Sequence, residues 1–259
     1  MRKIGLAAVK YLNTLPMLHG LKHSPHSGRF DLHLEDPAEC ARMLLEGEVD
    51  IALCPVGALI DIAGYHIVSQ YGIACKGPVR TVSIYSDQPL EELKVVRLYS
   101  ESRSSNLLAR ILDQKLWKLG LQFIGPDDDG PDLPTGHLVI GDACFDRETE
   151  FQHITDLGDA WMKLTGLPFL FACWVSIKPV DDDIRDILDN AFSFGIADLE
   201  NLDLPQSQIH VDLHHYLKHH IRYRIDAKTL DGMTKFINYV GDLDVSSHNA
   251  TQTPFGQSV

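Results

Sequence analysis

Short apolar runs alternate with amphipathic segments along the first part of the chain. An apolar run bounded by polar residues predicts a buried strand, and apolar residues three or four positions apart predict one face of a helix. Pro16 suits the first turn of a helix, and Gly47 suits the end of another. The predicted strands are 4–9, 30–34 and 50–53, and the predicted helices are 15–21 and 36–46. This alternation indicates an α/β fold with a parallel sheet.

Two longer strand-like runs, Val79–Tyr85 and Pro168–Ile177, interrupt this alternation. They bracket a second α/β set, with predicted strands 95–99, 121–124 and 138–140 and a predicted helix 104–119. We therefore expect two lobes, two crossings of the chain between them, and a ligand cleft at the crossings. Lobe one is expected to hold residues 1–83 and 176–259, and lobe two residues 84–175. The last part is expected to form a helix over 181–198, two helical stretches to about Val240, and a frayed tail from Ser246.

Composition and charge exclude several classes of protein. Of the 259 residues, 44% are hydrophobic and 23% are charged, a mix typical of a globular chain and not of a disordered one. Thirty-six acidic residues against 23 basic ones give a formal net charge of −13, which repels nucleic acid and anionic membranes. No apolar run approaches the ~20 residues of a membrane span, and the first is too short for a secretory signal. We expect a cytoplasmic monomer or homodimer that binds neither nucleic acid nor membranes.

The five cysteines are scattered, and no two have the spacing of a zinc site or a redox pair. Most of them have apolar neighbours, which predicts buried free thiols in a reducing compartment. They are Cys40, Cys54, Cys75, Cys144 and Cys173.

Polar segments follow two of the predicted strands, where ligands of open α/β sheets bind. Asn13 stands between the first strand and the first helix, where its amide either binds a ligand or caps the helix. The segment Ser100-Glu101-Ser102-Arg103-Ser104-Ser105 joins a strand to a helix. Its hydroxyls, its arginine and the free N–H groups of the helix start favour a carboxylate or phosphate. Arg80 and Thr81 begin the first long run and either face the cleft or lie on a surface strand.

Two clusters have metal-binding residue types but are better explained without a metal. Asp127-Asp128-Asp129-Gly130 lacks the glutamate of a calcium loop and predicts a turn. His214-His215 and His219-His220 have i, i+4 spacing, but no glutamate lies between them and a solvated helix face is favoured. The sequence also has no phosphate-binding loop, dinucleotide-binding turn or nucleophile elbow. We therefore expect neither a metal nor a cofactor.

Six segments, in this order and with this spacing, are more specific together than any one alone. They are Tyr11-Leu12-Asn13-x-x-Pro16, Gly47–Pro55, Gly77–Val82, Ser102–Ser105, Ile140–Ala143 and Asp156–Trp174. Taken together, they resemble the chorismate dehydratases of the futalosine route to menaquinone. The resemblance runs from Ile4 to about Val240. It implies a two-lobed, type 2 periplasmic-binding-protein fold and an enzyme that removes water from chorismate without a cofactor.

The resemblance also implies roles for individual residues. The family's catalytic asparagine falls on Asn13, and its cleft serine falls on Thr81, which keeps the hydroxyl. Its substrate-binding loop falls on Ser102, Arg103, Ser104 and Ser105, with Ser104 in place of the usual threonine. Asp142 is a further candidate, as a substrate ligand, a general base or a helix cap. With no clear base among these residues, the substrate's own enolpyruvyl carboxylate is the expected proton acceptor.

Three other functions stay open at this point. One is the sibling enzyme that makes 1,4-dihydroxy-6-naphthoate on the same fold. Another is a non-catalytic binder of a small carboxylate. The last is a sensory ligand-binding domain, which normally accompanies a DNA-binding module that we do not find in this sequence.

Overall fold

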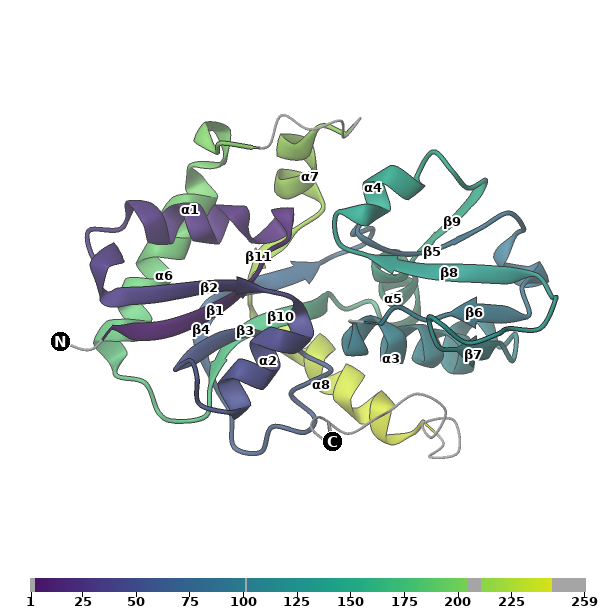
Figure 1. Ribbon diagram of the computed structural model, residues 1–259, viewed down its shortest axis with the longest axis horizontal. Helices are drawn as coiled ribbons and strands as arrows, with labels where there is room; N and C mark the ends of the chain where they lie inside the picture. The colour runs from purple at the N-terminus through teal and green to yellow at the C-terminus, as the bar shows by residue number, and fades with distance from the viewer. Residues whose placement is uncertain (1–2, 101, 205–210, 244–259) are drawn as a thin grey trace.

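The computed structural model describes residues 3–100, 102–204 and 211–243, and its strands form two sheets (Figure 1). One sheet has the strand order β11-β4-β10-β3-β1-β2, and the other has the order β7-β6-β8-β5-β9. The sheets lie side by side, each with its own helices, as expected for two lobes (Figure 1). The tail predicted to be frayed, from Ser246, lies outside the described residues.

The first sheet contains the strands predicted near the N-terminus. β1 (Ile4–Val9) pairs in parallel with β2 (Phe30–Glu35) and β3 (Ile51–Pro55), which confirms the predicted parallel arrangement. Two helices connect these strands, and each has a proline in its first turn, where no backbone N–H is needed. They are α1 (Leu15–His23) and α2 (Pro37–Leu45). The later helices of this lobe are α6 (Asp182–Ala197), α7 (Leu213–His219) and α8 (Ala227–Gly241).

Antiparallel strands complete this sheet. β10 (Phe169–Ser176) runs antiparallel between β3 and β4 (His66–Cys75), and the short β11 (Arg222–Arg224) pairs with the other side of β4. The sequence pattern did not predict β4 or β11. The first sheet is therefore mixed, with parallel strands at one edge only.

The second sheet is built around β8 (Thr135–Ile140). It pairs in parallel with β6 (Val95–Arg97) and antiparallel with β5 (Val82–Ser86). The outer strands are β7 (Gln122–Ile124) and β9 (His153–Asp156). The helices of this lobe are α3 (Arg103–Leu112), α4 (Ala143–Arg147) and α5 (Leu157–Thr165). The helix predicted over 104–119 is α3 followed by a π-helical turn, which ends at the left-handed residue Lys118.

The two crossings lie close to the predicted places, but the sheets divide the chain at different residues. β10 belongs to the first sheet, although residues up to 175 were expected in lobe two. An apolar run predicts a buried strand but does not say which sheet contains it. The run Val79–Tyr85 becomes a strand only at Val82, because Arg80 has a φ of 66°, outside the extended region. We propose lobes that follow the sheets, with crossings over residues 76–81 and 166–168.

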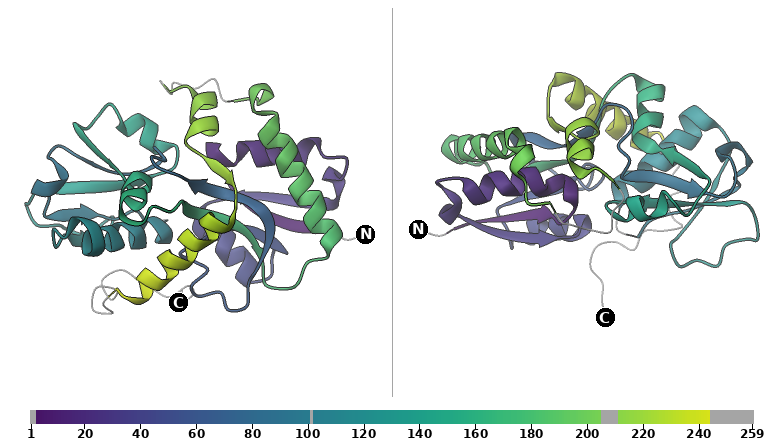
Figure 2. Two further views of the ribbon diagram at one scale, coloured as in Figure 1. Left: turned by 180° about the vertical axis from the view of Figure 1, so that it is seen from behind. Right: turned by 90° about the horizontal axis from the view of Figure 1, so that it is seen from above.

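An aromatic cluster joins the lobes at the second crossing. Trp161 of α5 is fully buried and packs edge-on against Phe169 of β10, with ring centroids 5.2 Å apart, and against Phe236 of α8 at 6.4 Å. α8 thus extends from the first sheet toward the helices of the second lobe (Figure 2). In the described part of the chain, no helix is both long enough and apolar enough to cross a membrane.

Candidate active site

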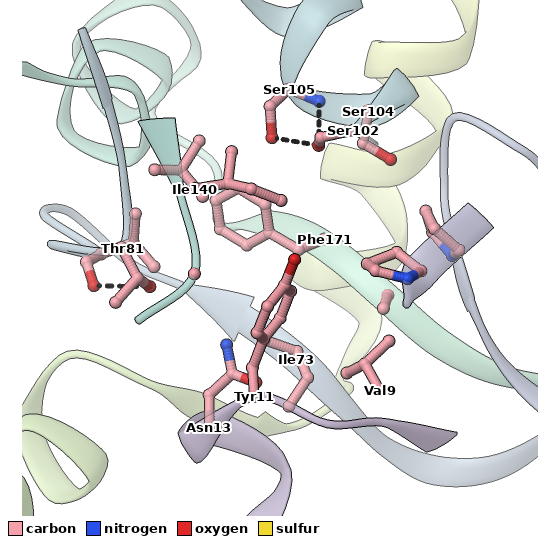
Figure 3. A pocket seen from close by; sticks show the side chains of 16 residues that line it. Val9, Tyr11, Asn13, Ile73, Thr81, Ser102, Ser104, Ser105, Ile140 and Phe171 are labelled. Atoms are coloured by element: carbon pink, nitrogen blue, oxygen red, sulfur yellow. Dashed lines mark hydrogen bonds between the residues drawn. The ribbon is translucent and has the colours of Figure 1, made fainter. Parts of the chain in front are cut away.

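A cavity that is partly open to solvent, with about 550 Å³ of space including its open mouth, is lined by residues of both sheets and of the first crossing (Figure 3). Most of its wall is apolar, and none of the described residues that line it is charged. The polar groups in the wall come from Tyr11, Asn13, Thr81, Ser102, Ser104 and Ser105. The structure therefore brings together five of the seven residues predicted for the site.

Two hydroxyls at the start of α3, those of Ser102 and Ser105, line the cavity and are hydrogen-bonded to each other. Ser102 is the residue that caps α3, and its Oγ accepts from Ser105 N at 3.3 Å. The same Ser102 hydroxyl donates to Ser105 Oγ at 2.8 Å. The proton of Ser105 is then left to donate to a ligand. Because the positive end of the helix dipole lies here, this group is suited to an anionic oxygen.

The third hydroxyl, that of Ser104, is oriented from the other lobe. Gly57 follows β3, and its N–H donates to Ser104 Oγ at 2.8 Å. With its oxygen accepting that bond, Ser104 can turn its own proton toward the cavity. Burial of all three serines, each less than a tenth exposed, strengthens any bond they make to a charged group.

Both arginines near the cavity are engaged elsewhere. The Arg103 guanidinium forms an ion pair with Asp61 and is not among the residues that line the cavity, and its role as a substrate ligand stays a prediction. Consecutive helical residues differ by about 100° in direction, so Arg103, the first residue of α3, need not share the orientation of Ser102. Arg80 Nη2 lies 2.7 Å from Glu148 Oε2, at the first crossing.

Asn13 and Thr81 lie at the other end of the cavity from the serines (Figure 3). Asn13 does not cap α1: the capping position is Thr14, and no side chain completes a cap there. Asn13 Oδ1 instead accepts from Thr14 Oγ1 at 3.3 Å. Thr81 is 2% exposed, and its Oγ1 lies 2.9 Å from the hydroxyl of Tyr216. The ligand-facing interpretation of Asn13 is thus the one that the geometry favours.

Tyr11 is a lining residue that the sequence did not single out. Its ring packs against Gly141 of the other lobe, where an added Cβ would lie 2.7 Å from a ring carbon. Gly141 also has a φ of 67°, a conformation that favours glycine. Both residues lie in segments that carry the family resemblance, but nothing local in those segments predicts their contact.

Asp142 lies beside the cavity and outside its wall. Its two carboxylate oxygens accept from Leu12 N, both at 3.2 Å, and its side chain makes no capping bond to α4. Burial raises the pKa of Asp142 to about 6, although the Leu12 N–H acts in the opposite direction. The carboxylate therefore connects the two lobes next to Asn13, and its role as a substrate ligand stays a prediction.

The clusters considered for metals have structural roles where the chain is described. Asp128 accepts from Gly125 N in a turn, and His220 Nδ1 lies 3.0 Å from Pro78 O. Among the described residues, no group of three or more potential ligands is arranged to hold a metal ion. All five cysteines are buried and free, as predicted, and burial raises the pKa of each thiol.

Comparison with known proteins agrees with this architecture. The chain is 26% identical to the chorismate dehydratase of Thermus thermophilus, over 93% of this chain and 96% of that protein. A crystal structure of a protein from Archaeoglobus fulgidus superposes with a TM-score of 0.70 at 14% identity, covering 93% of this chain and 97% of that one.

The periplasmic aliphatic sulphonate binding protein of Escherichia coli gives a TM-score of 0.61 at 14% identity, covering 93% of this chain and 92% of that one. Sequence identities this low support a shared fold and no shared function. The two solved structures confirm the predicted periplasmic-binding-protein-like fold. The sequence profile of a family described as "Menaquinone biosynthesis" matches residues 4–242, and the chain belongs to that family.

Proposed function

We propose that this protein removes water from chorismate to give 3-[(1-carboxyvinyl)oxy]benzoate. One observation carries the proposal: an apolar cavity between two lobes has hydrogen-bond donors at both ends. Chorismate has a carboxylate on its ring and another on its enolpyruvyl side chain. A neutral cavity with a set of donors for each carboxylate suits such a molecule, and the relative from Thermus thermophilus bears the name of this activity.

The reaction itself needs no co-reactant. The C3–H bond of chorismate breaks and its electron pair forms the new ring double bond, while the C4–O bond breaks and the hydroxyl leaves as water with the released proton. The ring becomes aromatic, which supplies the driving force. The protein has to hold the two carboxylates, favour removal of the C3 proton and assist the leaving hydroxyl.

We assign the ring carboxylate to the serine end of the cavity. Charge that develops at C3 delocalises through the diene into this carboxylate. The hydroxyls of Ser104 and Ser105, already oriented by Gly57 and Ser102, would stabilise that charge without rearranging.

We assign the enolpyruvyl side chain and the leaving hydroxyl to Asn13 and Thr81. The Asp142 carboxylate is occupied by the Leu12 N–H and lies outside the cavity wall, so it is poorly placed as a base. This supports the enolpyruvyl carboxylate of the substrate as the proton acceptor, with Asn13 fixing its position. We further propose that the protein works in the cytoplasm, where its five buried thiols stay reduced, as a monomer or homodimer.

The decisive experiment is incubation of the purified protein with chorismate, followed by mass and ultraviolet analysis. The expected product has lost one water and has the absorption of a substituted benzoate. Chorismate that is bound but unchanged would indicate a binding protein. No binding of chorismate, with formation of 1,4-dihydroxy-6-naphthoate from its own precursor, would indicate the sibling enzyme.

A further inference from the structure

One tyrosine outside the cavity wall connects both residues assigned to the reacting end. The hydroxyl of Tyr216, on α7, lies 2.9 Å from Thr81 Oγ1, and the side chain of Asn13 is close enough to act on the pKa of the same hydroxyl. The three residues come from three distant segments: the turn after β1, the first crossing, and α7. Asn13 and Thr81 line the cavity at the same end, whereas Tyr216 does not line it (Figure 3).

Tyr216 is held firmly by its surroundings. Its side chain is fully buried, and its ring packs edge-on against Phe145 of α4 with centroids 5.1 Å apart. α7 itself is capped by Asp212, whose carboxylate accepts from His215 N at 3.0 Å. Burial raises the pKa of Tyr216 above its usual range, so the hydroxyl keeps its proton at neutral pH.

The hydrogen bonds around this hydroxyl have one consistent direction. Thr14 Oγ1 donates to Asn13 Oδ1, which leaves the Asn13 amide N–H groups as donors, and Asn13 lowers the pKa of Tyr216 as a donor beside its oxygen would. Tyr216 then donates its single proton to Thr81 Oγ1. The Thr81 proton has only a long contact, 3.5 Å to Val79 O, and can turn to a ligand. The second Asn13 N–H is available in the same way.

We propose that Tyr216 is a positioning residue that fixes the orientation of both Asn13 and Thr81 for the reaction. The proposal rests on the proposed function for its kinetic test, but the geometry it describes does not depend on the identity of the substrate. It also gives α7 a role in supporting the site. The helix carries Tyr216 on its buried side, between His215 and His219 of the predicted solvated face.

The test replaces the hydroxyl and keeps the ring, in Tyr216→Phe. We expect kcat for chorismate to fall about 10- to 100-fold, the size of effect that follows a misplacement of reacting groups by about 1 Å. KM should stay close to that of the wild type, because the residues that line the cavity are unchanged. A Tyr216→Phe enzyme with wild-type kcat overturns the proposal. So does a fall in kcat that is fully accounted for by a lower melting temperature, that is, by loss of folded protein.

Tyr223 offers a matched control on the neighbouring strand β11. It is 5% exposed, and within the described residues its hydroxyl has no hydrogen-bond partner. Tyr223→Phe therefore removes a buried tyrosine hydroxyl without removing a bond to the site. We expect kcat, KM and the melting temperature of this variant to match the wild type. A fall in kcat equal to that of Tyr216→Phe would show a general effect of loosening this region and would overturn the proposal.

A second measurement separates this proposal from the proposed function. The side-chain amide resonances of Asn13 can be identified in NMR spectra by their absence from Asn13→Asp. We expect Tyr216→Phe to shift them and to speed their exchange with solvent, and Tyr223→Phe to leave them unchanged. If the wild type does not consume chorismate, the proposed function fails and these resonances decide the role of Tyr216. Unchanged Asn13 amide resonances in Tyr216→Phe would overturn the proposed positioning role of Tyr216.

Discussion

Gly57 and Ser104, from different lobes, approach each other more closely than any side chain on Gly57 would permit. The Gly57 N–H donates to Ser104 Oγ at 2.8 Å, and a Cβ on Gly57 would lie 2.8 Å from Ser104 N. Gly57 belongs to the first lobe and Ser104 to the second, so this hydrogen bond joins the two lobes. The orientation of a proposed substrate-binding hydroxyl therefore depends on a glycine in the opposite lobe.

Gly57→Ala should weaken binding of chorismate by about tenfold or more. The new methyl group displaces the start of α3, and a lost hydrogen bond to a charged group costs about 1.5–3 kcal/mol. Calorimetric titration would measure the affinity, with Gly28→Ala as a control, since a Cβ on Gly28 meets open space. Equal affinities for the two variants would mean that the contact between Gly57 and Ser104 tolerates the methyl group.

Removal of the serine hydroxyls should also weaken binding. For Ser104→Ala and for Ser105→Ala we expect the dissociation constant of chorismate to rise on the order of 10- to 100-fold, the equivalent of one charged hydrogen bond. Arg103→Gln should have a much smaller effect, because the guanidinium is paired with Asp61. Ser193→Ala, at an exposed position on α6, is the control. A larger loss in Arg103→Gln than in the two serine variants would restore Arg103 as the carboxylate ligand.

Asn13→Asp tests the other end of the cavity. This change removes the amide donors and places a negative charge beside the substrate carboxylate, so turnover should fall about 100-fold or more. Asn190→Asp makes the same charge change at an exposed position of α6 and should be harmless. Steady-state kinetics and thermal melting of both variants separate loss of function from loss of fold. A folded Asn13→Asp protein with wild-type turnover would remove Asn13 from the proposed mechanism.

Stability should decrease as the pH rises through the range in which Asp142 ionises. The folded state raises the pKa of this carboxyl from an ordinary value of 3.8 to about 6, so between these values the folded state binds more protons than the unfolded state. The free energy of unfolding then falls with rising pH, by on the order of 1–3 kcal/mol in total, and levels off above pH 6.

Asp142→Asn keeps an oxygen acceptor for the Leu12 N–H and removes the titration. Denaturant unfolding of both proteins from pH 4.5 to 7.5 should show the difference. The free energy of unfolding of the variant should increase relative to that of the wild type as the pH rises. Parallel profiles would mean that the carboxyl titrates near its ordinary pKa.

Much of the local structure was predictable from the sequence because it depends on neighbours along the chain. The apolar run Ile4–Val9 is a strand with those same bounds, and the proline of α2 stands where the pattern placed a helix start. The hydroxyl-rich segment after β6 does begin a helix, with Ser102 as its cap. Hydrophobic period and capping act over a few residues, so the pattern of residues contains them.

The sequence by itself thus determined the α/β class, the existence of two long crossing runs, and the segments that supply Asn13, Thr81 and the serines. Tertiary structure alone decided which sheet takes β10, where Arg103 points, and what Asp142 contacts. It also decided the contacts that organise the site: Gly57 with Ser104, 47 positions apart; Leu12 with Asp142, 130 apart; and Thr81 with Tyr216, 135 apart. Such pairs form only when distant segments of the chain pack together. A pattern of hydrophobic and polar residues indicates that a side chain is buried but not which distant partner it contacts.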